Sequence, residues 1–186
     1  MEALLFSALA AFLATWGDKS QLLVAHFSTA TRKPGQIFAG LVLAALASSV
    51  IAGVAGAWIA ESVTIRAMTL LVALALVFAA VAGLFHKAPR EQAPARWPLA
   101  ATFVLCLAAE VGGSAQFLTF ALAGRFASAP LAVAGATAGI AAACLPAALL
   151  GQGLRAALPV RAIRYGVAGT FLIAGFITAV SALQLT

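Results

Sequence analysis

Residues 15–21, Thr15-Trp16-Gly17-Asp18-Lys19-Ser20-Gln21, form a short polar interruption inside a long apolar N-terminal stretch. A second, altered copy occurs at Glu110-Val111-Gly112-Gly113-Ser114-Ala115-Gln116. Both copies lie near the middle of segments that are long enough to cross a bilayer. An ionised side chain at the bilayer centre costs roughly 2.5–3.5 kcal/mol on insertion scales, so Asp18, Lys19 and Glu110 need one another, polar backbone, water or a bound ion. The two interruptions are therefore the candidate site.

The composition around these interruptions is that of a membrane protein. Of 186 residues, 64% are hydrophobic and only 9% are charged. A soluble fold of this length could not bury so much apolar surface, so we expect one all-α integral membrane domain. The net charge of +6 arises from cations that fall mostly in loops, where they set topology, so nucleic acid is not an expected partner. Cys106 and Cys144 lie in apolar segments without a CxxC or histidine partner and are expected to be packing thiols.

Six apolar segments are each near the roughly 20 residues that a spanning helix needs. They are residues 3–27, 37–60, 64–85, 98–123, 131–153 and 159–184. The longest separator runs over residues 86–98 and holds several charged residues and prolines. It divides the chain into a first three-helix repeat, residues 1–85, and a second, residues 99–186.

The two halves resemble each other in sequence. A shift of 95 residues without a gap superposes Gly17 on Gly112, Gln21 on Gln116, Leu23 on Leu118, Gly40 on Gly135, Gly56 on Gly151 and Arg66 on Arg161. Because three spans are an odd number, the second half must enter the membrane from the opposite side. The pattern predicts six transmembrane helices in a 3+3 inverted repeat. Many secondary transporters share this plan, and their sites lie at the midplane where interrupted helices meet.

The cations predict the orientation of these helices. One side of the predicted topology carries Arg32, Lys33, Lys87, Arg90, Arg96, Arg155, Arg161 and Arg164, and the other carries Arg66 and Arg125. The positive-inside rule places the first group, and with it the 86–98 linker, in the cytoplasm. Both termini are then expected on the outer side of the membrane.

An inverted repeat would bring the first and fourth spans together, so that Asp18 faces Glu110. Neutral side chains from both motifs would surround them: Thr15, Ser20, Gln21, Ser114 and Gln116. Two carboxylates with neutral oxygens suit a hard divalent cation, namely Mn²⁺, Ca²⁺ or Mg²⁺. Without a cation, two facing carboxylates in a poorly solvated site should hold a proton between them, so that cation entry would expel protons. The alternative is structural: Asp18 and Lys19 satisfy each other or a neighbouring helix, and Glu110 is protonated and hydrogen-bonded.

Catalysis has little support in this sequence. It contains no set of nucleophile and base, no glycine-rich phosphate loop and no HExxH motif. We therefore expect no enzyme activity and no resident cofactor.

Trp16-Gly17-Asp18-Lys19-Ser20-Gln21-Leu22 resembles the E-x-G-D-[KR]-[ST] signature of the small manganese/calcium cation–proton exchangers. This family, part of the lysine-exporter superfamily, includes bacterial manganese exporters and proteins of the eukaryotic Golgi. The stretch 110–116 is similar to the second copy of the signature. The resemblance covers almost the whole chain and implies cation export from the cytosol driven by inward proton movement. It further implies that the motif carboxylates are ligands.

Both motifs are degenerate. Thr15 stands where the family has glutamate, and Gly113 and Ser114 replace the second aspartate and basic residue. Ligand roles for the metal and for proton coupling therefore transfer only to Asp18 and Glu110, with supporting roles for Gln21, Gln116 and Ser20.

We thus expect an exporter of a divalent cation, Mn²⁺ first and Ca²⁺ second, that exchanges it for protons in a bacterial inner membrane. Two alternatives stay open. One is an exporter of a small organic cation or an amino acid. The other is a non-transporting subunit that pairs with a full-motif partner, and a homo-oligomer is equally compatible with the sequence.

Overall fold

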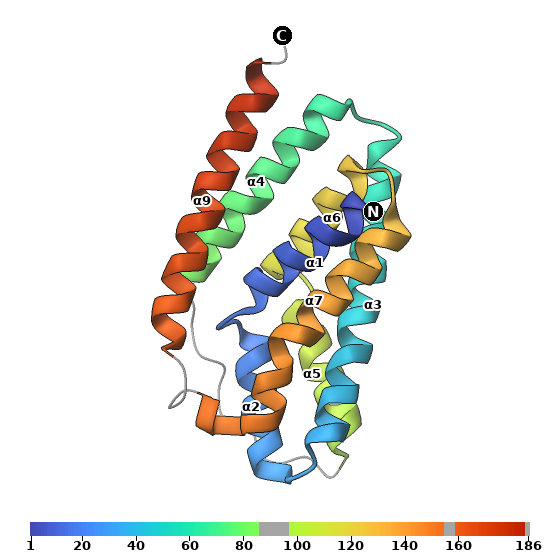
Figure 1. Ribbon diagram of the computed structural model, residues 1–186. Helices are drawn as coiled ribbons and strands as arrows, with labels where there is room; N and C mark the ends of the chain where they lie inside the picture. The colour runs from blue at the N-terminus through green and yellow to red at the C-terminus, as the bar shows by residue number, and fades with distance from the viewer. Residues whose placement is uncertain (86–96, 155–158, 185–186) are drawn as a thin grey trace.

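The computed structural model describes residues 1–85, 97–154 and 159–184, and all regular secondary structure in these ranges is helical (Figure 1). The elements are α1 (Glu2–Thr15), α2 (Lys19–Thr31), α3 (Pro34–Ala60), α4 (Ile65–Leu84), α5 (Pro98–Glu110), α6 (Ser114–Arg125), α7 (Ala129–Leu150), the 3₁₀ turn η1 (Gly151–Gly153) and α9 (Val160–Gln184). Most of the predicted linker, residues 86–96, lies outside the described residues.

Four of the described helices are long and apolar enough to cross a membrane by themselves: α3, α4, α7 with η1, and α9. The pair α5 and α6 qualifies as a fifth span that is bent by 66°, and α1 is a shorter apolar helix. The expected segments at 37–60, 64–85, 131–153 and 159–184 correspond to the four long helices. The expected first and fourth segments differ from the prediction, because each is broken into two helices at its polar motif.

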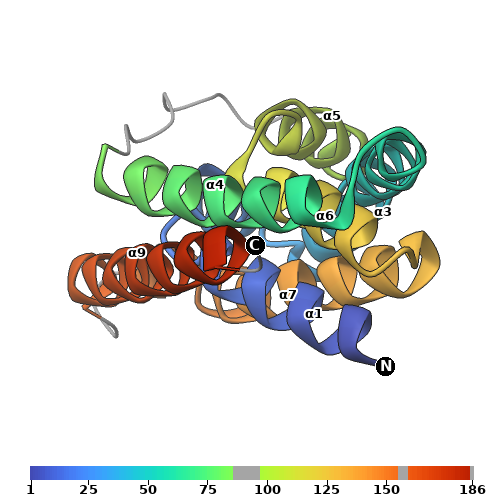
Figure 2. The same ribbon diagram turned by 90° about the horizontal axis from the view of Figure 1, so that it is seen from above.

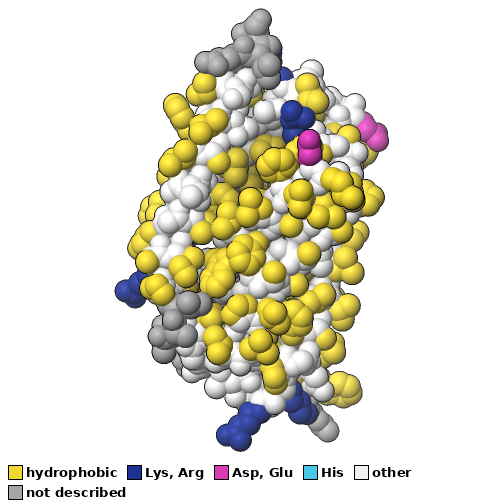
Figure 3. All heavy atoms as spheres, viewed as in Figure 1, with side chains coloured by type: hydrophobic (Ala, Val, Ile, Leu, Met, Phe, Trp, Pro, Cys, Tyr) yellow, Lys and Arg dark blue, Asp and Glu magenta, His cyan; other side chains and the backbone are white. Residues whose placement is uncertain are grey.

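The surface agrees with a bilayer environment. In Figure 3 the middle of the molecule is covered by hydrophobic side chains, and charged side chains gather mainly toward the two ends of this face. The exposed hydrophobic side chains are large, among them Leu74 and Phe78 on α4 and Ile173, Phe176 and Ile177 on α9. In water such a surface would be a liability, whereas in a bilayer it faces lipid.

The two breaks have nearly the same backbone. Trp16 and Val111 have φ/ψ of −64/116° and −61/117°, and the next residues, Gly17 and Gly112, have φ of 76° and 77°. In each break the residue after the glycine donates its N–H back across the turn. Asp18 N bonds Thr15 O at 3.1 Å, and Gly113 N bonds Glu110 O at 2.8 Å. These are the features of a type II turn, which requires positive φ at its third position and therefore favours glycine there.

Close glycine contacts hold the two halves together. A Cβ on Gly40 of α3 would meet the carbonyl oxygen of Leu99 in α5, and a Cβ on Gly135 of α7 would meet that of Leu4 in α1. The two contacts are equivalent in the sequence: Gly135 follows Gly40 by 95 residues, and Leu99 follows Leu4 by 95 residues. Each half therefore packs its long helix against the broken helix of the other half.

Helices α4 and α9 form a pair at the edge of the molecule (Figures 1 and 2). α9 packs chiefly against α4, and α4 in turn contacts α6. Ala168 and Phe171 of α9 are buried in this contact together with Ala75 and Ala79 of α4. The start of α9 comes to lie over the first break, since a Cβ on Gly17 would lie 3.3 Å from Val160 Cγ1.

Candidate functional site

Glu110 is the centre of the buried polar cluster. It is the last residue of α5, where the helix ends at the second break, and its side chain is 2% exposed. Ser20 Oγ from the first turn of α2 donates to Glu110 Oε1 at 2.6 Å, and Gln116 Nε2 from α6 donates to Glu110 Oε2 at 3.1 Å. The hydrogen bonds thus join three of the predicted site residues across the two halves of the chain.

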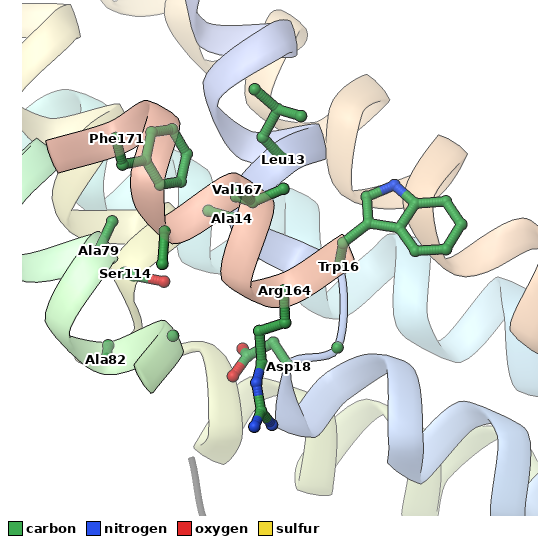
Figure 4. Close-up of a pocket in the computed structure, with 13 residues that line it drawn as sticks. Leu13, Ala14, Trp16, Asp18, Ala79, Ala82, Ser114, Arg164, Val167 and Phe171 are labelled. Atoms are coloured by element: carbon green, nitrogen blue, oxygen red, sulfur yellow. The ribbon is translucent and has the colours of Figure 1, made fainter. Parts of the chain in front are cut away.

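Asp18 and Ser114 line a small cavity, and Glu110, Ser20 and Gln116 are not in its lining (Figure 4). Asp18 is the residue that precedes α2, and Ser114 is the first residue of α6. The space open to the centre of a water-sized sphere is about 20 Å³, enough for about one water molecule or one ion. Asp18 also acts electrostatically on Glu110, so two carboxylates repel each other here unless a proton or a cation lies between them.

Two larger cavities adjoin the small one, because they share lining residues with it. A cavity of about 360 Å³ shares Asp18 and Ser114, and its wall includes Lys19 and the backbone of Gly112 and Gly113. A further cavity of about 440 Å³ shares Leu13 and Phe171 with the small one and is mostly apolar, with Arg125 in its lining. Asp18 therefore lines the small cavity and the cavity of about 360 Å³, and the small cavity also adjoins the apolar one.

Thr15 and Gln21 do not join the Glu110 cluster. Thr15 Oγ1 donates to Ala11 O of its own helix at 2.7 Å. α1 ends at Thr15, and the type II turn separates Thr15 from Asp18. Gln21 accepts from Gly17 N and donates to Ala143 O, both at 2.8 Å, so it stabilises the first turn and ties it to α7.

Two residues that the sequence analysis did not assign to the site contact it. Ser48 of α3 accepts from Gln116 Nε2 at 2.9 Å, and the pair Ser48-Ser49 inside an apolar segment was the available signal. Arg164 was counted among the cations of the predicted cytoplasmic side. In the structure it lies in the second turn of α9 and lines the small cavity together with Asp18.

A buried oxygen beside Glu110 is available to a ligand. Gln116 Oε1 has no hydrogen-bond partner among the described residues, although buried polar atoms nearly always have one. The described residues contain no group of three or more His, Cys, Asp or Glu side chains that could hold a metal ion. A metal at this place would therefore have to rely on two carboxylates and on neutral oxygens, which are ligands for hard cations.

Comparison with known protein families matches this chain to one family model. The family model described as Divalent cation/proton antiporter GDT1 matches the chain twice, over residues 3–91 and again over residues 98–186. The two matches have the register of 95 residues that superposes the two polar motifs. A protein of Vibrio cholerae serotype O1 named "Putative manganese exporter" is 31% identical over 184 residues, which cover 96% of this chain and 91% of that protein. No solved structure matches the chain.

Proposed function

This chain belongs to the GDT1 family of divalent cation/proton antiporters, and from that membership we propose that it exports Mn²⁺, or else Ca²⁺, from the cytoplasm in exchange for protons. The chain is a membrane transporter and not an enzyme. Mn²⁺ comes first in this proposal because the Vibrio relative is named as a manganese exporter. The observation that carries the proposal is the buried Glu110 carboxylate, which accepts hydrogen bonds from Ser20 and Gln116 and interacts electrostatically with Asp18.

Asp18 and Glu110 are the proposed ligands of both the cation and the proton. With both carboxylates ionised and no cation present, their repulsion in a buried place is costly, and one proton relieves it. A divalent cation relieves the same repulsion and makes the proton unnecessary, so cation binding and proton binding exclude each other. Gln116 Oε1 is the neutral oxygen best placed to join them, since it has no other partner among the described residues. Ser114 lines the same cavity, and Ser20 orients Glu110.

The size of the small cavity favours an ion over the organic substrates. About 20 Å³ accommodates one ion, whereas an amino acid or an organic cation needs the space of several heavy atoms. Glu110 accepts hydrogen bonds from Ser20 and Gln116, and the described residues contain no group of three or more His, Cys, Asp or Glu that could hold a metal ion. A site made mainly of oxygens favours Mn²⁺ or Ca²⁺ over zinc and copper.

The proposed cycle uses the two halves as inverted repeats, residues 1–85 and 99–186, joined by a cytoplasmic linker at 86–98 with both termini outside. The equal turns at the two breaks and the equivalent glycine contacts support this arrangement. The cation enters through the cavity of about 360 Å³, which includes Phe85 next to the linker. It leaves past Leu13 and Phe171 into the cavity of about 440 Å³ when one repeat rocks against the other.

Flux measurements in proteoliposomes test the proposal. A Mn²⁺ gradient should drive proton movement through the purified chain, and Asp18→Asn or Glu110→Gln should each abolish it. Glu61→Gln is the matched control, because Glu61 is an exposed acid at the end of α3 and should leave the flux unchanged. Unchanged flux in both site variants would reject the assignment. No flux from the intact chain alone, restored by a second membrane protein, would identify it as a non-transporting subunit.

A further inference from the structure

The side chain of Arg164 passes directly over the first break. A Cβ on Gly17 would lie 3.4 Å from Arg164 Cδ and 3.3 Å from Cγ1 of Val160, which is one turn earlier on α9. On the other side, a Cβ on Gly83 of α4 would lie 4.0 Å from Arg164 Cγ. The aliphatic part of Arg164 thus runs between two glycines, one in the turn of the break and one on α4.

Arg164 lines the small cavity, and Figure 4 shows its side chain running beside the carboxylate of Asp18. Its Nε atom is buried and has no hydrogen-bond partner among the described residues. Its guanidinium carbon lies 5.6 Å from the centre of the Tyr165 ring, an arrangement that stabilises a cation on an aromatic face. A guanidinium keeps its proton under all physiological conditions, so this positive charge leaves the cavity only if the side chain or α9 moves.

We propose that Arg164 is a tethered cation of the transport site, which supplies positive charge at Asp18 in the metal-free state and is displaced when the divalent cation binds. This inference rests on the proposed function. Two carboxylates carry two negative charges, and a divalent cation alone compensates both. Arg164 and the metal therefore compete for the same negative charge, and the competition links occupation of the site to movement at the start of α9.

The repeat register shows that this cation has no equivalent in the first half. The residue 95 positions before Arg164 is Thr69, which is uncharged. Thr69 accepts a hydrogen bond from Arg125 at 2.9 Å, and both residues line the apolar cavity of about 440 Å³. At the second break, a Cβ on Gly112 would meet nothing within 4 Å. Arg164 is thus an addition to one side of the site and not a consequence of the duplicated sequence.

Binding and turnover must be measured separately, because a tethered competitor affects them in opposite directions. The variants are Arg164→Gln, which removes the charge, and Arg164→Lys, which keeps it. Arg161→Gln is the matched control, since it removes one positive charge from an exposed position one turn earlier on the same helix. The readouts are the Kd for Mn²⁺, from the electron paramagnetic resonance signal of free Mn²⁺ over purified protein, and the rate of Mn²⁺-driven proton flux.

Arg164→Gln should bind Mn²⁺ about tenfold more tightly, because a like charge has left the site, and should turn over about tenfold more slowly. Arg164→Lys keeps the positive charge on which the competition depends and should stay within about twofold of the wild type in both, and so should Arg161→Gln. If Arg164→Gln does not fold, Arg164→Met keeps the aliphatic stem and should show the same two changes.

Weaker or unchanged Mn²⁺ binding in the neutral variants would overturn the role of Arg164. A wild-type chain that neither binds Mn²⁺ or Ca²⁺ nor moves protons would instead overturn the proposed function, so the two failures are distinguishable.

Discussion

The two breaks of the chain have the same backbone and different surroundings. Their turns agree within a few degrees in φ and ψ, and both place a glycine at positive φ. Yet the start of α9 covers Gly17, whereas Gly112 faces the cavity of about 360 Å³. The duplicated sequence thus specifies the turn, and the side chains that differ between the copies specify what each turn does.

The glutamines of the two breaks show this division most clearly. Gln21 forms both of its hydrogen bonds with backbone groups: it accepts from Gly17 N and donates to Ala143 O. Gln116 at the equivalent position bonds Glu110 and Ser48 and leaves its oxygen without a partner among the described residues. The partner positions, 48 and 143, are themselves 95 residues apart. Gln21 therefore supports the turn of the first break, whereas Gln116 holds the buried acid of the second.

Replacing each glutamine by leucine should have the largest effects and should separate the two roles. Gln21→Leu leaves Gly17 N–H without its partner, at a cost of about 1–3 kcal/mol, and removes a second bond worth about 1 kcal/mol. It should lower the free energy of unfolding, measured by SDS titration, and change the Kd for Mn²⁺ little. Gln116→Leu should weaken Mn²⁺ binding at least about tenfold with a smaller loss of stability. Equal effects of the two changes on both quantities would show that the breaks do not divide these roles.

The covering of the first break predicts a difference between its glycine and the other one. Alanine at φ near +77° costs about 1–2 kcal/mol in either turn. Gly17→Ala should cost more, because its Cβ would also press on Val160 at 3.3 Å, whereas Gly112→Ala meets open space. Gly35→Ala in the first turn of α3, where nothing lies within 4 Å, should be neutral or stabilising. The thermal unfolding midpoints of the three variants in detergent should rank Gly17→Ala lowest and Gly35→Ala highest. A lower midpoint for Gly112→Ala than for Gly17→Ala would contradict this prediction.

Restoring a carboxylate to the first break should sharpen the comparison. Thr15 is the repeat equivalent of Glu110, and its hydroxyl only bonds its own helix. Thr15→Glu adds one negative charge near Asp18 and should tighten Mn²⁺ binding about tenfold. Thr15→Gln has the same size without the charge and should not tighten it. If the glutamine variant binds as tightly as the glutamate variant, charge is not the cause.

The smallest effect is expected at Lys19, whose repeat equivalent is Ser114. Lys19 is exposed and lines the cavity through which the cation is proposed to enter. Lys19→Gln should raise the rate of Mn²⁺ entry about twofold at low ionic strength, and salt should remove the difference by screening. An effect that persists at high salt would indicate a direct contact with the ion instead.

The positions of the two breaks could be predicted from the sequence. The polar motifs and their glycines mark the two breaks, because a charged motif inside an apolar segment and a residue that tolerates positive φ are both visible in one dimension. The grouping of Glu110 with Ser20 and Gln116 also follows from the predicted meeting of the first and fourth spans.

The position of Arg164 could not be predicted in this way. A cation near the end of an apolar segment normally lies at the membrane surface, and the positive-inside rule counts it there. Its place at the cavity depends on how far α9 is displaced along α4, which is a property of helix packing and not of the local sequence. For the same reason the sequence did not distinguish Gln21 from Gln116, which occupy equivalent positions but have different neighbours.

The crossed glycine contacts also bear on how the protein is made. α1 packs on α7, and α3 packs on α5, so both helices from the first half find their partners only after the second half has been synthesised. Until then the newly inserted N-terminal half has no α7 carbonyl to receive Gln21 and no Glu110 to receive Ser20. The polar side chains around Gly17 therefore gain these partners only when residues of the second half have been inserted, so we expect biogenesis of this transporter to depend on completion of the whole polypeptide.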